Sequence, residues 1–344
     1  MTEGTTLLSA ERPLNELYDA ALLDLDGVVY VGSRAVPAAP EAVDKARAAG
    51  MRVAFVTNNA ARTPARVAER LSGMGVAAAP QDVVTSSDAA ARLIAEHVPA
   101  GSAVLVVGDT GLRLALRRHG LRPVSVASDR PAAVVQGYSP RLNYDLMVQG
   151  ALAVAAGALF VSTNGDATAP LDFGVQPGNG AATRVIAHAT GQEPLVAGKP
   201  QRPLHEEGVL RTGAQTPLVV GDRLDTDVES AAVRGVASLL VFSGVTTPAR
   251  AVAASPKHRP AYLAWDLSGL NQTHPAVRTE PGRAVCGGWT AELRKDRLRL
   301  SGRGGRLDGL RAVCACAWAA HPDSAPRQDL ADDALAELGL PDEA

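Results

Sequence analysis

The feature that most limits the possible folds is an alternation of short apolar runs with amphipathic stretches over the first 245 residues. The apolar runs have the length of single buried strands, and the stretches between them have helical periodicity. Strands separated by helices indicate βαβ units, in which helices cover both faces of a parallel sheet. An α/β fold with a parallel sheet is therefore predicted. The predicted strands cover residues 19–26, 51–59, 103–109, 132–137, 158–166, 217–222 and 238–244.

Two of the intervening stretches carry clear helix boundaries. Residues 39–50 predict a helix that ends at Gly50, and residues 63–75 predict one with Thr63 as N-cap and Pro64 at the first helical position. In parallel sheets, functional residues gather beyond the carboxyl ends of the strands. The polar residues at these strand ends are therefore the candidates for a site.

Composition and charge exclude several classes of function. A net charge of −2 provides no basic field for nucleic acid and no polybasic patch for a membrane. The most apolar segment, residues 150–161, is too short to span a bilayer, and Glu3 stands where a signal peptide needs positive charge. The odd count of three cysteines indicates a reducing compartment without disulfides. We expect a soluble cytoplasmic protein.

The first polar strand end is Asp24-Leu25-Asp26-Gly27, within the run ALLDLDGVVY. In an extended chain, residues i and i+2 point to the same side, so both carboxylates can face one spot. They repel each other unless a cation or a shared proton lies between them. Mg²⁺ is the natural cation because it prefers oxygen ligands. The alternative is a turn with two solvated aspartates.

Two further segments carry groups that suit a phosphate. The run FVTNN brings Thr57, Asn58 and Asn59 to a strand end, where a hydroxyl and backbone N–H groups can bind phosphate oxygens. Lys199, in VAGKP, is one of four lysines in a chain that otherwise uses arginine, which suggests a need for a compact point charge. Ordinary turn chemistry and an ordinary surface lysine are the respective alternatives.

The fourth segment is PLVVGDRLDTDVES, with three aspartates after an apolar strand. Asp222 can reach a metal at the edge of the sheet. Asp225 and Asp227 follow in the turn, where Asp225 or Thr226 can cap the next helix. Capping accounts for one of these acids but not for all three, so a metal site is one hypothesis for the others and ordinary turn chemistry is the alternative.

The order of these four segments resembles the four motifs of the haloacid dehalogenase superfamily. The strings DLDGVVY, TNNAARTP, PLVAGKP and GDRLDTD are similar to the NagD-like subfamily of sugar and nucleotide phosphatases, which includes p-nitrophenyl-phosphatases. The resemblance covers about residues 17–250. It implies a Rossmann-like parallel-sheet core with an inserted α/β cap domain of the C2 type.

The resemblance also implies a role for each matching residue. Asp24 is expected to be the nucleophile that forms an aspartyl-phosphate, and Asp26 the group that protonates the leaving alkoxide and then activates water. Thr57 and the backbone amide of Asn58 would hold the non-transferred oxygens, and Lys199 would orient and neutralise the phosphoryl group.

A magnesium site is implied by the same resemblance. Its ligands would be Asp24, the backbone carbonyl of Asp26, and Asp222, with Asp227 in a supporting position. The physical chemistry agrees, because phosphoryl transfer depends mainly on positioning and on charge compensation.

The long segment between Thr57 and Lys199 exceeds any usual connection between core elements. The predicted division is a discontinuous core in residues 17–85 and 191–275, with the cap domain in residues 86–190.

Two features of the predicted cap concern the substrate. Asn164 and Asp166 are expected to contact the substrate, with turn chemistry as the alternative. Gly178 and Gly180 are expected to be hinge points between cap and core.

Residues 276–344 form a small α+β C-terminal module outside the common family pattern. A hairpin in 289–305, a helix in 306–321 and an acidic helix in 330–339 are predicted. Such a tail accompanies actinobacterial-type glycerol-3-phosphate phosphatases and resembles a shortened acetyltransferase fragment. We expect it to serve in docking or dimer stabilisation, with Cys314 and Cys316 in helix packing rather than in a metal site.

The predicted function is Mg²⁺-dependent hydrolysis of a small phosphate ester, with glycerol 3-phosphate as the leading substrate. 2-Phosphoglycolate, sugar phosphates and nucleoside monophosphates are alternatives with the same mechanism. A non-catalytic regulatory protein and a CoA-dependent acyltransferase are alternatives from other classes. A homodimer could form through the cap or the C-terminal module, and no nucleic acid or membrane partner is expected.

Overall fold

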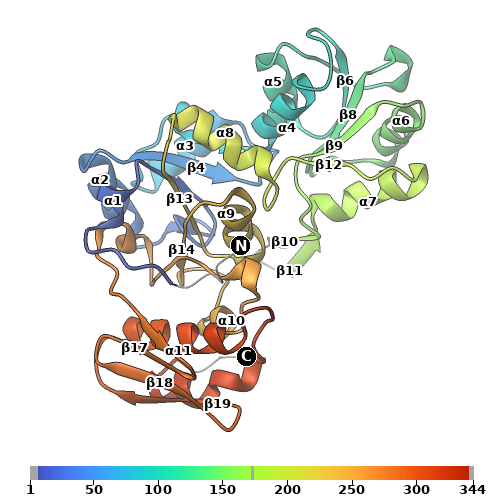
Figure 1. Cartoon of the computed structure of the whole chain (residues 1–344). Helices are drawn as coiled ribbons and strands as arrows, with labels where there is room; N and C mark the ends of the chain where they lie inside the picture. The colour runs from blue at the N-terminus through green and yellow to red at the C-terminus, as the bar shows by residue number, and fades with distance from the viewer. Residues whose placement is uncertain (1–6, 172–173, 341–344) are drawn as a thin grey trace. The chain divides into compact units, whose positions relative to one another are not determined.

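A computed structural model describes residues 7–171 and 174–340, and the chain divides into two compact units (Figure 1). The first unit contains Met1–Val53 and Ala214–Ala344, and the second contains Ala54–Gly213. Each unit is built around its own parallel sheet. The predicted α/β class is confirmed.

The sheet of the first unit has the strand order β15-β14-β13-β1. Every residue of β1 and β13 is buried, as expected for continuous apolar strands covered on both faces. The neighbouring strand β4 begins beside β1, since Arg52 N donates to Asp19 O at 3.0 Å, and continues into the second unit. The bounds are β1 Ala20–Leu23, β4 Arg52–Thr57, β13 Pro217–Gly221, β14 Ser238–Val241 and β15 Tyr262–Ala264.

Helices α1 (Leu14–Leu17), α2 (Ala39–Ala48), α9 (Glu229–Arg234) and α10 (Pro248–Val252) belong to the first unit. The predicted end of α2 is confirmed, because Gly50 follows it in a left-handed conformation with a φ of 93°. A single π-helical turn, η3 (Leu224–Val228), leads directly into α9. The short pair β2 (Tyr30–Val31) and β3 (Arg34–Ala35) completes this part.

The C-terminal segment of the first unit contains the predicted hairpin and the two predicted helices, together with two earlier strands that were not predicted. An antiparallel sheet of β16 (Arg278–Glu280), β17 (Arg283–Cys286), β18 (Trp289–Arg294) and β19 (Arg297–Gly302) precedes α11 (Arg306–Ala320) and α12 (Asp332–Glu337). Lys295 and Asp296 both have positive φ, which matches the twist that a two-residue hairpin turn needs. Residues of this segment share one hydrophobic cluster with β14, β15 and α10, so the tail packs on the parallel-sheet part of its unit.

The main sheet of the second unit has the order β12-β9-β8-β6-β7. Its strands are parallel: β6 Ala103–Val107, β7 Arg122–Val124, β8 Ala133–Gln136, β9 Leu159–Ser162 and β12 Leu195–Val196. Helices α5 (Thr110–Arg118), α6 (Tyr144–Ala155) and α7 (Asn179–Thr190) lie between these strands in the chain. An antiparallel pair, β10 (Thr168–Leu171) and β11 (Gly174–Pro177), leads into α7.

The remainder of the second unit contains most of β4 with its parallel partner β5 (Val83–Thr85). Helices α3 (Pro64–Gly73), α4 (Ser86–Ala95) and α8 (Arg202–Thr212) accompany these strands. The predicted cap of α3 is confirmed, since Arg66 N donates to Thr63 Oγ1 at 3.3 Å.

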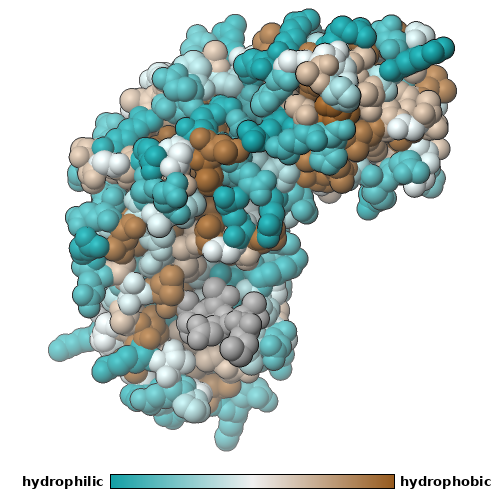
Figure 2. Space-filling model, turned by 45° about the horizontal axis from the view of Figure 1, so that its top comes forward, coloured by the Kyte–Doolittle hydropathy of each residue, from teal (hydrophilic) through white to brown (hydrophobic). Residues whose placement is uncertain are grey.

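The surface view in Figure 2 is largely hydrophilic, with apolar residues gathered in several separate groups. Within residues 7–171 and 174–340, no helix combines the length and the apolar character needed to cross a lipid bilayer.

Candidate active site

Three acids lie together in the first unit. Asp24 directly follows β1, and Asp222 directly follows β13, the parallel neighbour of β1. Asp24 N donates to Val220 O at 2.8 Å, which aligns the two strand ends. One carboxylate oxygen from each of Asp24, Asp222 and Asp227 lies within 4.8 Å of the others. The sequence prediction that Asp24 and Asp222 meet at one edge of the sheet is confirmed.

Asp222 is tightly held. It is 1% exposed, and its Oδ2 accepts a hydrogen bond from Val245 N at 2.7 Å. A Cβ added to Gly27 or Gly244 would overlap the Asp222 carboxylate. Gly27 also has a φ of 81°, so both its conformation and its neighbour exclude other residues. The sequence indicated the turn at Gly27, but it held no signal for the contact with Gly244.

The acids of the turn after β13 separate into two kinds. Asp227 is 1% exposed, accepts from Arg223 N at 3.2 Å, and occupies the space that a side chain at Gly221 would need. Asp225 points away and pairs with Arg223 at 2.8 Å, and this guanidinium lowers the pKa of its carboxyl. The expected N-cap is wrong: Arg223 occupies that position without a side-chain cap, because the turn is π-helical.

Three carboxylates this close repel one another, and two of them are removed from water. A bound cation relieves both penalties, and an all-oxygen ligand set fits Mg²⁺. The Asp26 carboxylate is exposed and outside this group, with Tyr30 Oη donating to its Oδ2 at 3.3 Å. A metal contact from Asp26 through its backbone carbonyl stays a prediction.

The second unit holds the residues predicted to bind phosphate. Thr57 ends β4 and is 5% exposed, and its Oγ1 accepts from Asn59 N at 3.1 Å. Lys199 is 3% exposed, and its backbone N donates to Asn58 Oδ1 at 2.8 Å. Asn58, next to Thr57 in the chain, is thus linked to Lys199 within one unit, and the binding of phosphate by these residues stays a prediction.

Asn164 and Asp166 join the same network. Asn164 is 4% exposed, and its Nδ2 donates to Asn58 O at 2.8 Å. Its Oδ1 accepts from Asp166 N at 3.1 Å, so its side chain organises the loop. The carboxylate of Asp166 accepts from Asn58 Nδ2 at 3.3 Å.

The structure adds residues that the sequence did not single out. Asn179, at the start of α7, is 3% exposed and donates to Ser162 Oγ and to Asn164 O, both at 2.9 Å. Gly178 and Gly180 flank Asn179 in the chain. Their backbones closely approach the carbonyls of Asp166 and Gly165, which leaves no room for a side chain at either position. Glycines flanking Asn179 in the sequence could indicate a hinge or a close approach, and only the structure identifies the close approach.

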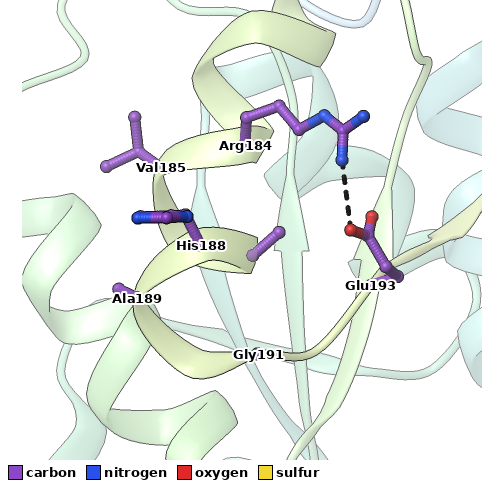
Figure 3. Close-up of a pocket in the computed structure, with 7 residues that line it drawn as sticks. Arg184, Val185, His188, Ala189, Gly191 and Glu193 are labelled. Atoms are coloured by element: carbon purple, nitrogen blue, oxygen red, sulfur yellow. Dashed lines mark hydrogen bonds and ion pairs between the residues drawn. The ribbon is translucent and has the colours of Figure 1, made fainter.

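A separate cavity of about 800 Å³ lies on α7 (Figure 3). It is lined by residues of α7 and the following loop, with Arg184 paired to Glu193 at 3.1 Å. None of the predicted site residues lines this cavity, so it belongs to a different surface of the second unit.

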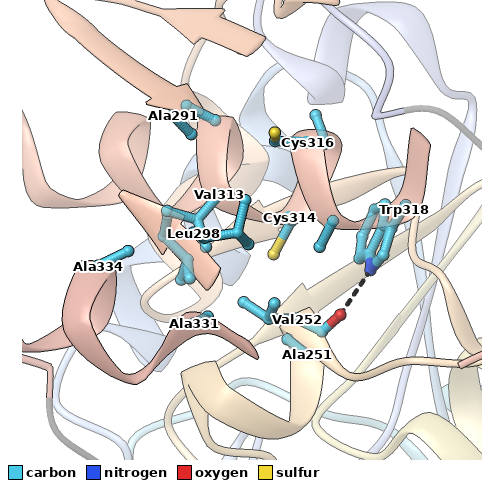
Figure 4. Packing of buried hydrophobic residues seen from close by; sticks show 14 of the residues in the cluster. Ala251, Val252, Ala291, Leu298, Val313, Cys314, Cys316, Trp318, Ala331 and Ala334 are labelled. Atoms are coloured by element: carbon cyan, nitrogen blue, oxygen red, sulfur yellow. Dashed lines mark hydrogen bonds between the residues drawn. The ribbon is translucent and has the colours of Figure 1, made fainter. Parts of the chain in front are cut away.

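The cysteines of the tail are buried in the hydrophobic cluster (Figure 4). Burial raises the pKa of Cys286 and of Cys316 to about 11, which keeps both thiols protonated at neutral pH. Trp318 packs in the same cluster and donates from Nε1 to Val252 O at 3.1 Å. The prediction that Cys314 and Cys316 serve helix packing agrees with this environment.

Models of two hydrolase families match the chain: haloacid dehalogenase-like hydrolase over residues 21–122 and HAD-hydrolase-like over residues 196–270. A GCN5-related N-acetyltransferase-like domain matches residues 286–340, which agrees with the predicted acetyltransferase-like tail.

Relatives of known activity extend over most of the chain. The chain is 40% identical over 317 residues to a D-glycerol 3-phosphate phosphatase of Mycobacterium tuberculosis, covering 90% of this chain and 88% of that protein. It is 37% identical to a 5′-nucleotidase of Bacillus subtilis, covering 67% of this chain and 89% of that protein. A glycerol phosphate phosphatase from M. tuberculosis solved with magnesium has a TM-score of 0.85 at 37% identity, covering 96% of this chain and 99% of that one. The chain therefore belongs to the haloacid dehalogenase-like hydrolase family.

Proposed function

We propose that the chain is a Mg²⁺-dependent phosphatase that hydrolyses glycerol 3-phosphate to glycerol and phosphate. The observation that carries the proposal is the group of three carboxylates at the ends of β1 and β13 and in the turn after β13. The similarity to the mycobacterial phosphatase over 90% of the chain supports the choice of substrate.

In the proposed reaction, an oxygen of Asp24 attacks phosphorus and the bond from phosphorus to the ester oxygen breaks. Asp26 gives its proton to the leaving alkoxide, and glycerol departs. Asp26 then takes a proton from water, whose oxygen attacks the aspartyl-phosphate and releases phosphate. The exposure of Asp26 supports this role, because it must exchange protons with solvent.

Charge compensation in this proposal comes from protein groups and from a metal ion. Thr57 and the backbone N–H of Asn58 hold the non-transferred oxygens, and Lys199 neutralises them. Asp24, the Asp26 carbonyl and Asp222 would hold Mg²⁺, with Asp227 supporting, and the ion supplies positive charge to the transferring group. The closely spaced acids fit such an ion.

We further propose the three-part division predicted from the sequence, with the core in 17–85 and 191–275, the cap in 86–190 and the tail in 276–344. In it, Asn164 and Asp166 belong to the cap and contact the alcohol side of the substrate, with Gly178 and Gly180 at the hinge. The bonds from Asn164 to Asn58 and Asp166 support a shared role for this loop. Three buried free cysteines support a reducing, cytoplasmic setting.

A homodimer through the cap has support from one helix face. Tyr144, Val148 and Leu152 recur every fourth residue on α6 and are 73%, 36% and 54% exposed. Leu152→Glu is expected to lower the mass measured by sedimentation from dimer to monomer. A wild-type protein that sediments as a monomer at every concentration would remove this part of the proposal.

A phosphate-release screen tests the substrate. Purified protein with Mg²⁺ is offered glycerol 3-phosphate, 2-phosphoglycolate, sugar phosphates and nucleoside monophosphates in parallel. The largest kcat/KM is expected for glycerol 3-phosphate. A preference for another ester changes the substrate alone, whereas no phosphate release from any of them favours the non-catalytic alternative.

A further inference from the structure

One side chain in the second unit joins three segments that are distant in sequence. The Asn58 amide contacts the backbone of Lys199 and the carboxylate of Asp166. Its Oδ1 accepts from Lys199 N at 2.8 Å, and its Nδ2 lies 3.3 Å from both Asp166 oxygens and 3.4 Å from Lys199 O. Its oxygen therefore accepts from the Lys199 N–H, and its NH₂ group donates to Asp166 and to the Lys199 carbonyl.

The Asn58 backbone is fixed as well. Its carbonyl accepts from Ser86 Oγ at 2.7 Å and from Asn164 Nδ2 at 2.8 Å. A Cβ on Gly198 would lie 2.6 Å from Asn58 Oδ1, so the glycine before Lys199 leaves room for the amide. The side chain has one orientation available, with its NH₂ group toward Asp166.

This orientation needs an acceptor at position 166 and a donor at position 58. An ionised carboxylate offers only acceptors, and the amide NH₂ group is the one donor part of Asn58 that faces it. A hydrogen bond to a charged acceptor is stronger than a neutral one, so it holds the Asp166 carboxylate in place. A carboxylate has about four lone-pair sites and can accept several hydrogen bonds at once, including bonds from hydroxyl groups.

We propose that the Asn58 side chain is a positioning residue that holds the Asp166 carboxylate beside Lys199, so that Asp166 binds the free hydroxyl groups of the alcohol half of a phosphorylated polyol. The proposal rests on the proposed phosphatase function and deepens it. It separates the two halves of Asn58: its backbone N–H belongs to phosphate binding, and its amide belongs to the selection of the alcohol.

The test compares kcat/KM for glycerol 3-phosphate, which has hydroxyl groups, with kcat/KM for p-nitrophenyl phosphate, which has none. In Asn58→Asp, the carboxylate still accepts from Lys199 N but repels Asp166. The ratio of the two kcat/KM values is expected to fall about 10- to 100-fold, because a misplaced binding group costs that much. The exchange variant Asn58→Asp/Asp166→Asn reverses donor and acceptor at constant charge and is expected to restore most of the ratio.

Asn59→Asp is the matched control. It adds the same charge one residue away, and a carboxylate can still accept from Ala61 N and Arg62 N as Asn59 Oδ1 does. It is expected to leave the ratio unchanged. If Asn58→Asp does not fold, as judged by thermal unfolding, Asp166→Ala is expected to lower the same ratio.

An equal loss for both substrates in Asn58→Asp and in Asp166→Ala would overturn the proposal, since a merely structural role affects both. An exchange variant that leaves the ratio low would do so too. Failure of the phosphatase proposal is distinguishable, because the wild type would then release phosphate from neither substrate.

Discussion

The main-chain N–H of Val245 donates to Asp222 Oδ2 at 2.7 Å, and so one oxygen of a buried acid is oriented by the loop after β14. The glycine before Val245 permits this contact, because a Cβ on Gly244 would overlap the carboxylate. A loop without catalytic side chains of its own therefore shapes the three-carboxylate group.

Gly244→Ala is expected to weaken Mg²⁺ binding by roughly 10- to 100-fold, the usual cost of disturbing a group that orients a ligand. Calorimetric titration with Mg²⁺ measures this. Gly73→Ala is the control, since a Cβ there meets no atom within 4 Å. Unchanged affinity in Gly244→Ala would show that Asp222 is not a ligand.

Asp24→Asn is expected to abolish phosphate release while leaving the unfolding temperature close to that of the wild type, because the amide is a poor nucleophile of similar shape. The comparison is with Asp225→Asn, an acid of the same site region that is 61% exposed and lies outside the three-carboxylate group. Mg²⁺-dependent turnover by Asp24→Asn would contradict the mechanism.

Trp318→Ala is expected to lower the free energy of unfolding by about 3–5 kcal/mol, the cost of a large buried aromatic. The indole is 3% exposed and bonds to Val252 O, which ties the tail to α10. Trp265→Ala, at a site that is 37% exposed, is expected to cost much less. Urea unfolding measures both variants. An equal loss of unfolding free energy in Trp318→Ala and Trp265→Ala would argue against a docking role for the tail.

Stability is expected to fall in acid because of His274, which is 2% exposed. Its Nε2 donates to Gly269 O at 3.0 Å and its Nδ1 faces Arg311 Nη2 at 3.3 Å, so the ring is neutral when folded. Burial lowers the pKa of His274 below 6.5, and Arg311 lowers it further. As the pH falls, the unfolded state therefore binds a proton on His274 before the folded state does. The contribution of neutral His274 to stability is lost as the pH falls below about 6.5.

Urea unfolding between pH 5 and pH 8 checks this. His274→Gln is expected to be less stable than the wild type at pH 8 and to lose part of the slope of the unfolding free energy against pH. If the unfolding free energy of His274→Gln varies with pH as steeply as that of the wild type, the acid sensitivity belongs to other groups.

Gln136→Met is expected to raise the free energy of unfolding by about 1 kcal/mol or more, since a buried amide without hydrogen bonds is costly. Gln136 is 0% exposed, and within the part of the chain that the structure describes its amide has no hydrogen-bond partner. Destabilisation in thermal unfolding would instead indicate a bound internal water.

Much of the fold follows from local pattern. The apolar runs that become β1, β4, β13 and β14 are readable in sequence because each strand is buried on both faces. The same alternation predicts that Asp24 and Asp222 emerge at one sheet edge. Thr63 and Gly50 mark helix ends through chemistry that needs only neighbouring residues.

The α/β class, the strand ends and the polar residues that follow them can be predicted from the amino-acid sequence, because they depend on periodicity and on neighbours along the chain. The close-range contacts between distant segments are visible in the folded chain alone. It brings Asp227 rather than Asp225 to Asp24 and Asp222, and it joins Asn58 to Asp166 and Lys199. Such contacts depend on how closely two backbones pack, as at Gly198 and Gly244. The partners are distant in sequence, so no local pattern indicates that they lie close together in space.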